Sequence, residues 1–179
     1  MTKPEEWVVL PTALPLIRRR CPSCSSQLFR AHGKFRVNAN HKLLDVWLLA
    51  LCAGCGQTIK LTVLERATVR AIDPSTLDRF HDNDPELAAR VLADPAWQRR
   101  TNVTLDWTGA WTIQKTAAES PDVRVRFAAR IPIHVTKLLS AGLAVPVSEV
   151  RRLVADGRLT STHRLTGRVS ADFGFTRVP

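Results

Sequence analysis

The stretch "LCAGCGQT", residues 51–58, contains two cysteines separated by two residues, and the same spacing occurs earlier in "CPSC", residues 21–24. These are the four cysteines of the chain, so none is left over. Two intervening residues let the backbone turn so that both sulfurs face one cation, and Ser23, Ala53 and Gly54 are small enough for that turn. In a reducing compartment, paired Cys-x-x-Cys elements indicate a metal site rather than disulfides.

The cysteine spacing therefore predicts a structural zinc ion held by Cys21, Cys24, Cys52 and Cys55. Four protein thiolates leave no coordination position for water, so the ion is expected to be structural and not catalytic. Iron is the alternative metal, because tetrahedral thiolate sites also bind iron. A thioredoxin-like dithiol would need a helix after the cysteine pair, whereas "GQTIKLTV" alternates like a strand.

The residues around the two cysteine pairs predict a zinc ribbon, here a three-stranded antiparallel sheet pinned by the ion at one end. The strand-like segments are 28–39, 45–52 and 58–65, with a turn at 38–42. Because so small a sheet buries little apolar surface, the region is expected to lose its fold without metal. His32 and His41 lie within the ribbon and are expected to be exposed, since four cysteines already fill the site.

Three phrases carry a family resemblance: "GKFRVNANHKLLDVWLLALC" at 33–52, "ER" at 65–66 and "NDPELA" at 83–88. In these phrases the chain resembles a bacterial family described as domain of unknown function 1062. The resemblance implies a zinc-ribbon-like N-terminal part and implies no substrate.

Beyond the ribbon, the sequence predicts a mixed segment of helices and a hairpin. Asp73-Pro74 and Asp84-Pro85 are typical helix starts, in which the acid caps and the proline occupies the first turn. Asp94-Pro95 is expected to end the second helix. "NVTLDWTGAWTIQKT" at 102–116 alternates on both sides of residues 108–110, which predicts a β-hairpin.

The C-terminal third predicts a strand followed by two short helices. Residues 123–127 alternate apolar and arginine side chains, as a strand with one buried face does. Val135, Leu138, Leu139 and Gly142 repeat at helical spacing. Ser148 is expected to cap a second helix that ends at Gly157.

This pair of helices resembles the alpha-L RNA-binding motif, found in small-subunit ribosomal protein four, pseudouridine synthases and tyrosyl-tRNA synthetases. The matching residues are Lys137, Leu138, Leu139, Ser148, Glu149, Arg151, Gly157 and Arg158. His134 stands where the motif usually has Arg, Thr136 replaces its Asp, and the Val-Asn-Gly close is absent. The resemblance implies an RNA-binding face formed by His134, Lys137, Arg151, Arg152 and Arg158.

The charge of the chain favours an anionic partner. Its 26 Lys and Arg against 16 Asp and Glu give a net charge of +10 and a pI near 10.5. Residues 1–64 hold 9 basic and 3 acidic side chains, residues 65–122 hold 7 and 10, and residues 123–179 hold 10 and 3. Both ends are thus candidates for phosphate contact. No platform of stacking aromatics is expected beside the arginines, since the tryptophans lie in apolar alternations.

We therefore expect an α+β protein of four segments: an N-terminal arm (1–20), the zinc ribbon (21–66), a helical segment with a hairpin (67–122) and a basic alpha-L-like module (123–179). The expected function is that of an RNA-binding accessory protein, associated with structured RNA or the ribosome. A zinc-ribbon protein-interaction or regulatory module without nucleic-acid binding is the alternative. The sequence does not define the RNA target, the oligomeric state or the order of residues 160–179.

Catalysis and membrane insertion are not expected. The sequence lacks a Gly-rich phosphate loop, an His-Glu-x-x-His element and a nucleophile elbow. The N-terminus "MTKPEEWVVLP" has acids and prolines where a signal peptide needs a basic start and an apolar run, which predicts a cytoplasmic protein. The longest apolar stretch, "LLDVWLLALC", is interrupted by Asp45 and too short to span a bilayer.

Overall fold

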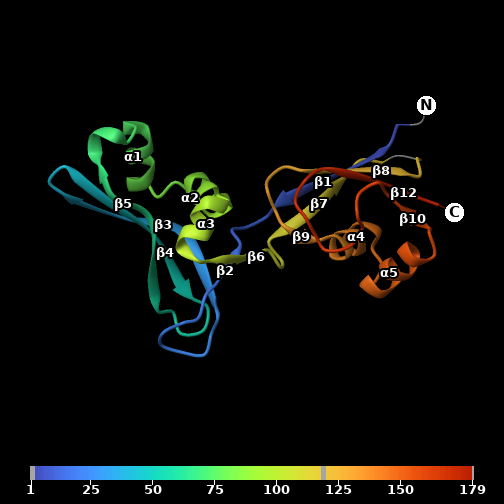
Figure 1. Ribbon diagram of the computed structural model, residues 1–179, viewed down its shortest axis with the longest axis horizontal. Helices are drawn as coiled ribbons and strands as arrows, with labels where there is room; N and C mark the ends of the chain where they lie inside the picture. The colour runs from blue at the N-terminus through green and yellow to red at the C-terminus, as the bar shows by residue number, and fades with distance from the viewer. Residues whose placement is uncertain (1–2, 118–119, 179) are drawn as a thin grey trace. The chain divides into compact units, whose positions relative to one another are not determined.

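The computed structural model describes residues 3–117 and 120–178 and has an α+β fold, as the sequence predicts (Figure 1). The chain forms two compact units: unit 1 comprises Met1–Ala13 with Gly109–Pro179, and unit 2 comprises Leu14–Thr108. Unit 2 is therefore inserted in the sequence between the first strand of unit 1 and the rest of that unit. These units differ from the four expected segments, because residues 1–20 and 67–122 are each divided between the two.

Unit 2 is built on a five-stranded antiparallel sheet. Its strand order is β5-β4-β3-β2-β6. The strands are β2 (Leu16–Arg18), β3 (Leu28–Asn40), β4 (Leu43–Cys52), β5 (Thr58–Thr68) and β6 (Thr104–Asp106). The three expected ribbon strands are present as β3, β4 and β5, but they form the larger part of a wider sheet. Phe29, Leu48 and Leu61 are buried on one of its faces.

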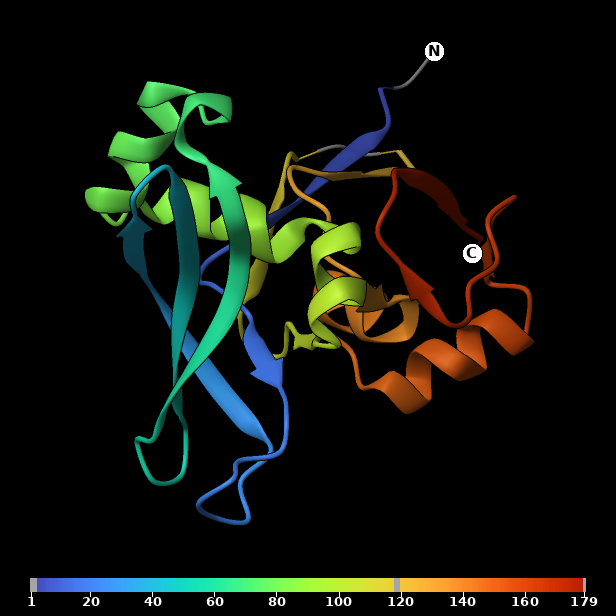
Figure 2. The ribbon, with the colours of Figure 1, turned by 60° about the vertical axis from the view of Figure 1, so that its left-hand side comes forward.

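Short helices pack against this sheet (Figures 1 and 2). They are α1 (Pro74–His81), α2 (Pro85–Ala93) and α3 (Pro95–Thr101), and the 3-10 helix η1 (Val69–Ala71) precedes them. The Phe80 ring of α1 meets the Phe35 ring of β3 edge-on, with centroids 5.0 Å apart. Gly33 approaches Pro85 and Ala88 of α2 at an irregularity of β3, where its φ is +74°.

The Asp-Pro signals start helices as expected, but one of them also starts a helix that the sequence analysis missed. Asp73 caps α1 and Asp84 caps α2 through their carboxylates. Asp94 ends α2, and its carboxylate then accepts from the Ala96 N–H and caps α3. The dipeptide Asp94-Pro95 thus ends α2 and begins α3.

The Asp84 cap is expected to make unit 2 sensitive to acid. The Arg79 guanidinium and the N–H groups of Glu86 and Leu87 hold the pKa of Asp84 below its ordinary value of 3.8. A carboxylate whose folded pKa is lowered contributes stability above its unfolded pKa and loses it as pH falls through the folded pKa. We expect the urea midpoint of unit 2 to fall between pH 5 and pH 2 less steeply in Asp84→Asn than in the wild type. An identical slope in both proteins would contradict this role for the charge.

Unit 1 contains a mixed sheet of five strands in the order β10-β12-β8-β1-β7, in which β1 and β8 run parallel. The strands are β1 (Glu5–Pro11), β7 (Trp111–Lys115), β8 (Asp122–Phe127), β10 (Leu159–Thr160) and β12 (Phe173–Arg177). A two-stranded sheet pairs β9 (Ile133–His134) with β11 (Arg168–Val169). Residues 160–178 thus contain the last residue of β10 and the strands β11 and β12.

Two helices complete unit 1: α4 (Val135–Leu143) and α5 (Val147–Ala155). The apolar residues expected on one face of the first helix, Val135, Leu138, Leu139 and Gly142, are all buried. Gly157 follows α5 with a φ of +70°, as expected of a helix-ending glycine. Ser148 does not cap α5: Pro146 occupies the N-cap, and the cap makes no side-chain hydrogen bond.

The expected hairpin at 102–116 is wrong. Its two arms, β6 and β7, belong to different sheets: β6 pairs with β2, and β7 pairs with β1. The chain leaves unit 2 at Thr108 and enters unit 1 at Gly109. Each arm has a better partner elsewhere, and the Arg18–Asp106 ion pair of 2.6 Å joins β2 to β6.

The N-terminal segment is a structural part of unit 1 and not a separate arm. Trp7 and Val9 of β1 are fully buried. Glu5, on the Trp7 side of the strand, forms an ion pair with Arg177 of β12 at 2.6 Å, and Glu6, on the opposite side, forms one with Arg126 of β8 at 3.3 Å. Trp7 and Val9 alternate with the half-buried Val8 and Leu10, which is the burial pattern of a strand inside a sheet.

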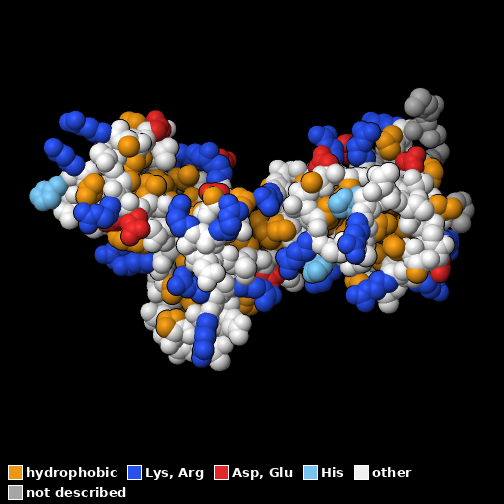
Figure 3. Space-filling view, in the orientation of Figure 1, with side chains coloured by type: hydrophobic (Ala, Val, Ile, Leu, Met, Phe, Trp, Pro, Cys, Tyr) orange, Lys and Arg blue, Asp and Glu red, His pale blue; other side chains and the backbone are white. Residues whose placement is uncertain are grey.

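The positive charge is shared evenly by the two units. Counted by unit, unit 1 has 12 basic and 7 acidic residues and unit 2 has 14 and 9, which gives +5 for each. Cationic side chains are visible on both units in Figure 3. The excess of basic residues near the two ends of the sequence is therefore distributed over both units, and neither unit is acidic. None of the helices in residues 3–117 and 120–178 has the length and apolar character that crossing a bilayer would require.

Candidate metal centre

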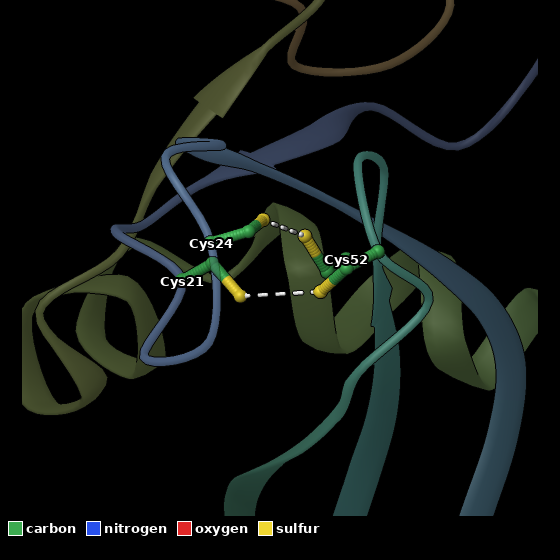
Figure 4. A group of neighbouring side chains, drawn as sticks. Cys21, Cys24 and Cys52 are labelled. Carbon is green, nitrogen blue, oxygen red and sulfur yellow. Dashed lines mark hydrogen bonds between the residues drawn. The ribbon is translucent and has the colours of Figure 1, made fainter.

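The four cysteines come from two loops at one end of the unit 2 sheet. Cys21 and Cys24 lie in the loop between β2 and β3, Cys52 is the last residue of β4, and Cys55 lies in the turn before β5. Their sulfurs point toward one another (Figure 4). Residues that the sequence separates by 27 positions are thus brought together by the β3–β4 pairing, which aligns Phe29 with Cys52.

The spacing of the sulfurs fits a tetrahedral metal site. The Sγ atoms of Cys21 and Cys55 are 3.7 Å apart, those of Cys24 and Cys52 are 3.6 Å apart, and all four lie within 4.8 Å of one another. Disulfide sulfurs would be about 2.05 Å apart. Metal–sulfur bonds of about 2.3 Å in a tetrahedron separate the sulfurs by about 3.8 Å. The geometry therefore matches a site for one ion.

The two loops have the same backbone closure, which explains how they present two sulfurs each. The Cys21 N–H donates to the Ser26 carbonyl, and the Cys52 N–H donates to the Gln57 carbonyl, at 2.9 Å in both cases. In each loop the N–H two residues beyond the first cysteine donates to its sulfur: Ser23 to Cys21 at 3.4 Å, and Gly54 to Cys52 at 3.3 Å. Such N–H donors favour the thiolate form that binds metal.

Gly54 is the residue that allows the loops to approach closely. A Cβ at this position would lie 3.0 Å from the Ser26 Cβ and 3.3 Å from the Cys24 Sγ. The loops are also joined directly by the Ala53 N–H, which donates to the Leu28 carbonyl at 2.8 Å. Packing against the first loop therefore favours the glycine in "CAGC".

The thiols differ in acidity because four sulfurs share a small volume. The Ser26 N–H acts to lower the pKa of Cys24, but burial and the neighbouring cysteine sulfurs outweigh it and raise that pKa to about 12. N–H donation from Cys55 and Gly54 lowers the pKa of Cys52 to about 6 despite burial. A cluster that disfavours several negative charges at once would be neutralised by a divalent cation, which deprotonates its thiol ligands. The donor set thus fits a metal.

The exposure of the four cysteines is graded. Cys21 and Cys52 are buried, Cys24 is half-buried and Cys55 is exposed. His32 and His41, which lie within the same strands and turn, are exposed and do not belong to the cysteine cluster. The cluster that could hold a metal ion therefore consists of the four residues that the cysteine spacing identifies.

The residues of the expected RNA-binding face all reach solvent. His134 lies at the N-terminus of α4, Lys137 within it, Arg151 and Arg152 on α5, and Arg158 just after α5. Arg152 forms an ion pair with Glu149 at 2.7 Å, and this contact raises the pKa of Arg152. Among the described residues, Arg151 and Arg158 take part in no ion pair.

One surface feature was missed by the sequence analysis. The neighbours of Trp47 in β4 are buried on one side of the strand. Trp47 lies on the other side and is only half-buried. The Lys60 ammonium lies 5.4 Å from the centroid of its ring. The signal was present in "DVWLLALC", where apolar residues occupy both faces of the strand and not every second position.

A family model described as "Protein of unknown function (DUF1062)" matches residues 37–165, and the chain belongs to this family. The matched span contains the second cysteine pair and helices α1 to α5, and begins after the first cysteine pair. No curated protein and no solved structure matches the chain.

Proposed function

We propose that Cys21, Cys24, Cys52 and Cys55 hold a structural zinc ion. The observation that carries this assignment is the set of four sulfurs at tetrahedral spacing, supplied by two loops with the same backbone closure. The bound ion would crosslink the two loops and neutralise the thiolates, without an open position for substrate. Iron is the competing metal, because it accepts the same ligands.

Metal analysis of the purified protein tests the assignment. We expect one zinc per chain and no visible absorption, and less than one-tenth of that metal in Cys52→Ser. A coloured protein with one iron per chain would show that the metal is iron and not zinc. A metal-free protein that keeps its fold would contradict a metal site of either kind.

We further propose that the protein is an RNA-binding accessory protein whose partner is structured RNA, such as that of the ribosome. The support is the alpha-L resemblance of α4 and α5 together with the exposure of His134, Lys137, Arg151, Arg152 and Arg158. Arginine suits this role because its planar guanidinium binds phosphate oxygens in pairs. Structured RNA offers a backbone and a shallow groove that such a face can contact by shape.

Replacing Arg151 and Arg152 by alanine is expected to weaken RNA binding without unfolding the protein. Both side chains are exposed, so the melting temperature is expected to change little. Each lost phosphate contact reduces the slope of log affinity against log salt by about one. Binding to ribosomal RNA, transfer RNA and duplex DNA across a salt series measures both quantities.

The matched control is Arg130→Ala with Arg164→Ala, which removes the same charge from exposed positions of unit 1 outside α4 and α5. Equal losses of RNA affinity in the two double variants would show that the effect comes from net charge and not from the α4–α5 face. Weak binding to all three nucleic acids that disappears with salt would instead favour the protein-interaction function.

A further inference from the structure

We propose that the sheet face of unit 2 that points away from α1 and α2 binds a single strand of nucleic acid, with bases stacked on Trp47. We call this surface the open face and define it by Arg30 and Arg36 of β3, Trp47, Leu49 and Leu51 of β4, and Lys60 of β5. It is distinct from the α4–α5 face of unit 1, so the two proposals stand or fall separately.

The strand register places these side chains on one surface. Arg36 lies directly opposite Trp47, Arg30 opposite Leu51, and Lys60 opposite Leu49. Residues directly opposite each other in neighbouring strands share a face. Their neighbours in β4, such as Leu48 and Ala50, are fully buried on the other face, which includes the Phe35 side chain that meets Phe80 of α1.

The apolar content of the open face is not explained by the helical layer. A sheet covered on one face normally alternates apolar and polar residues, whereas a nearly continuous apolar run is typical of a strand covered on both faces. β4 has such a run, yet α1 and α2 contact the sheet through the buried side of β3. Trp47 and Leu49 remain half-buried, and Leu51 is 36% exposed. A second partner for β4 is therefore expected on this face.

The charges around the apolar row indicate that the partner is an anion. Arg30, Arg36 and Lys60 are exposed and flank β4 from both sides, with neighbouring strands about 4.8 Å apart. Of the nine acidic residues of unit 2, six lie between Asp73 and Asp94, on the helices and their caps. Asp45 of β4 is engaged, since its carboxylate accepts from the Arg66 N–H at 2.7 Å. The acids of unit 2 thus lie mainly in the helical layer.

Among the possible polyanions, Trp47 favours a single strand of nucleic acid. An aromatic ring beside cations binds single strands because bases stack on the ring while the cations contact phosphates. Base faces are hidden inside a duplex, and the Asp and Glu side chains of an acidic peptide have no ring to stack. The Lys60 ammonium over the indole is a flexible partner, which can move from the ring to a phosphate when a base takes its place.

The test is fluorescence anisotropy with labelled 12-nucleotide oligo-U and oligo-dT, a 12-base-pair RNA duplex and poly-glutamate, on metal-loaded full-length protein. We expect the single strands to bind more tightly than the duplex or poly-glutamate at equal salt. Trp47→Ala is expected to weaken single-strand binding about tenfold. Trp47→Phe, which keeps an aromatic face, is expected to retain most of the affinity. The two single strands distinguish an RNA partner from a DNA partner.

Charge-matched variants separate the open face from net charge. Arg36→Ala and Arg90→Ala each remove one cation from unit 2, the first from the open face and the second from an exposed position of α2. We expect only Arg36→Ala to weaken single-strand binding at moderate salt, and we expect the Arg151/Arg152 double variant to bind single strands as the wild type does. Unchanged affinity in folded Trp47→Ala and Arg36→Ala, or equal binding of poly-glutamate, would overturn the proposal.

Discussion

Removal of the metal is expected to unfold unit 2 and to leave unit 1 folded. A structural zinc ion contributes about 10–16 kcal/mol to the folding of zinc-finger peptides. A domain is usually stable by only about 5–15 kcal/mol in total. The cysteine loops close one end of the β3–β4–β5 sheet, and without the ion their sulfurs lose the crosslink between the loops. Unit 2 therefore has little stability left to keep it folded.

Unit 1 is expected to survive because it has its own core. Its sheet buries Trp7, Val125 and Phe175, the Trp7 ring lies against Gly142 of α4, and Leu138 of α4 is fully buried. An unfolded unit 2 would become a long loop between Ala13 and Gly109. Loop-closure cost rises by only about 0.6 kcal/mol for each doubling of loop length.

Hydrogen exchange before and after chelation measures this result by segment. We expect protection to disappear in β3, β4 and β5 and to persist in β8, β12 and α4, with recovery when zinc is restored. Cys52→Ser is expected to reproduce the chelated pattern without a chelator. Full protection of β3 to β5 in protein shown to be free of metal would refute the structural role of the site.

Placing an alanine at Gly142 is expected to destabilise unit 1 strongly, although glycine-to-alanine changes inside helices usually stabilise. A Cβ on Gly142 would overlap the Cζ3, Cη2 and Cε3 atoms of the Trp7 ring. Trp7 cannot move aside easily, because its ring is fully buried, its Nε1 donates to Glu5 at 2.7 Å, and it packs edge-on against Phe175. The Lys115 ammonium lies 5.1 Å from the ring centroid and donates to the Gly142 carbonyl.

We expect Gly142→Ala to lower the free energy of unfolding of unit 1 by about 2–3 kcal/mol, the cost of overpacking a filled core. Helix propensity alone would raise it by about 1 kcal/mol. The sign of the change therefore decides between packing and propensity. Ala141→Gly is the control at the exposed neighbouring position, where propensity alone predicts a loss of about 1 kcal/mol.

A double-mutant cycle identifies the ring as the cause. Trp7→Phe removes part of the indole, so Gly142→Ala in that background is expected to cost less than it does in the wild type. The free energy of unfolding of unit 1 in the four proteins is measured by chemical denaturation, with hydrogen exchange in α4 as the probe. Equal costs in both backgrounds would show that the strain lies elsewhere.

Local signals in the sequence were the most reliable guide to this protein. The metal-ligand candidates follow from cysteine spacing, the ribbon strands from alternation, and the starts of α1 and α2 from Asp-Pro pairs. Each of these depends on residues close together in the chain. The start of α3 at Asp94 was not predictable from such a signal, because an Asp-Pro pair that ends one helix has the same letters as one that begins the next.

Signals that depend on distant partners could not be interpreted from neighbouring residues. The segment 102–116 has the pattern of a hairpin, yet its arms pair with β2 and β1, about 90 and 100 residues earlier in the chain. Pro11 and Pro15 exclude a regular helix from residues 1–20, which predicts an arm, whereas the burial of β1 depends on its pairing with β7 and β8. The open face has the same origin: the apolar alternation around the tryptophans predicts no stacking platform, because an apolar run does not show which of its sides a helix will cover.

The sequence by itself determined the four candidate ligands, the alternation of β3 to β5 and β8, and the apolar face of α4, because each is set by spacing within one segment. The tertiary structure decided the insertion of unit 2 into unit 1, the separation of β6 from β7, and the exposure of Trp47 beside Arg36 and Lys60. The physical reason is that strand pairing and the covering of a sheet are settled by burial among segments far apart in the chain, where a local pattern offers several partners of similar quality.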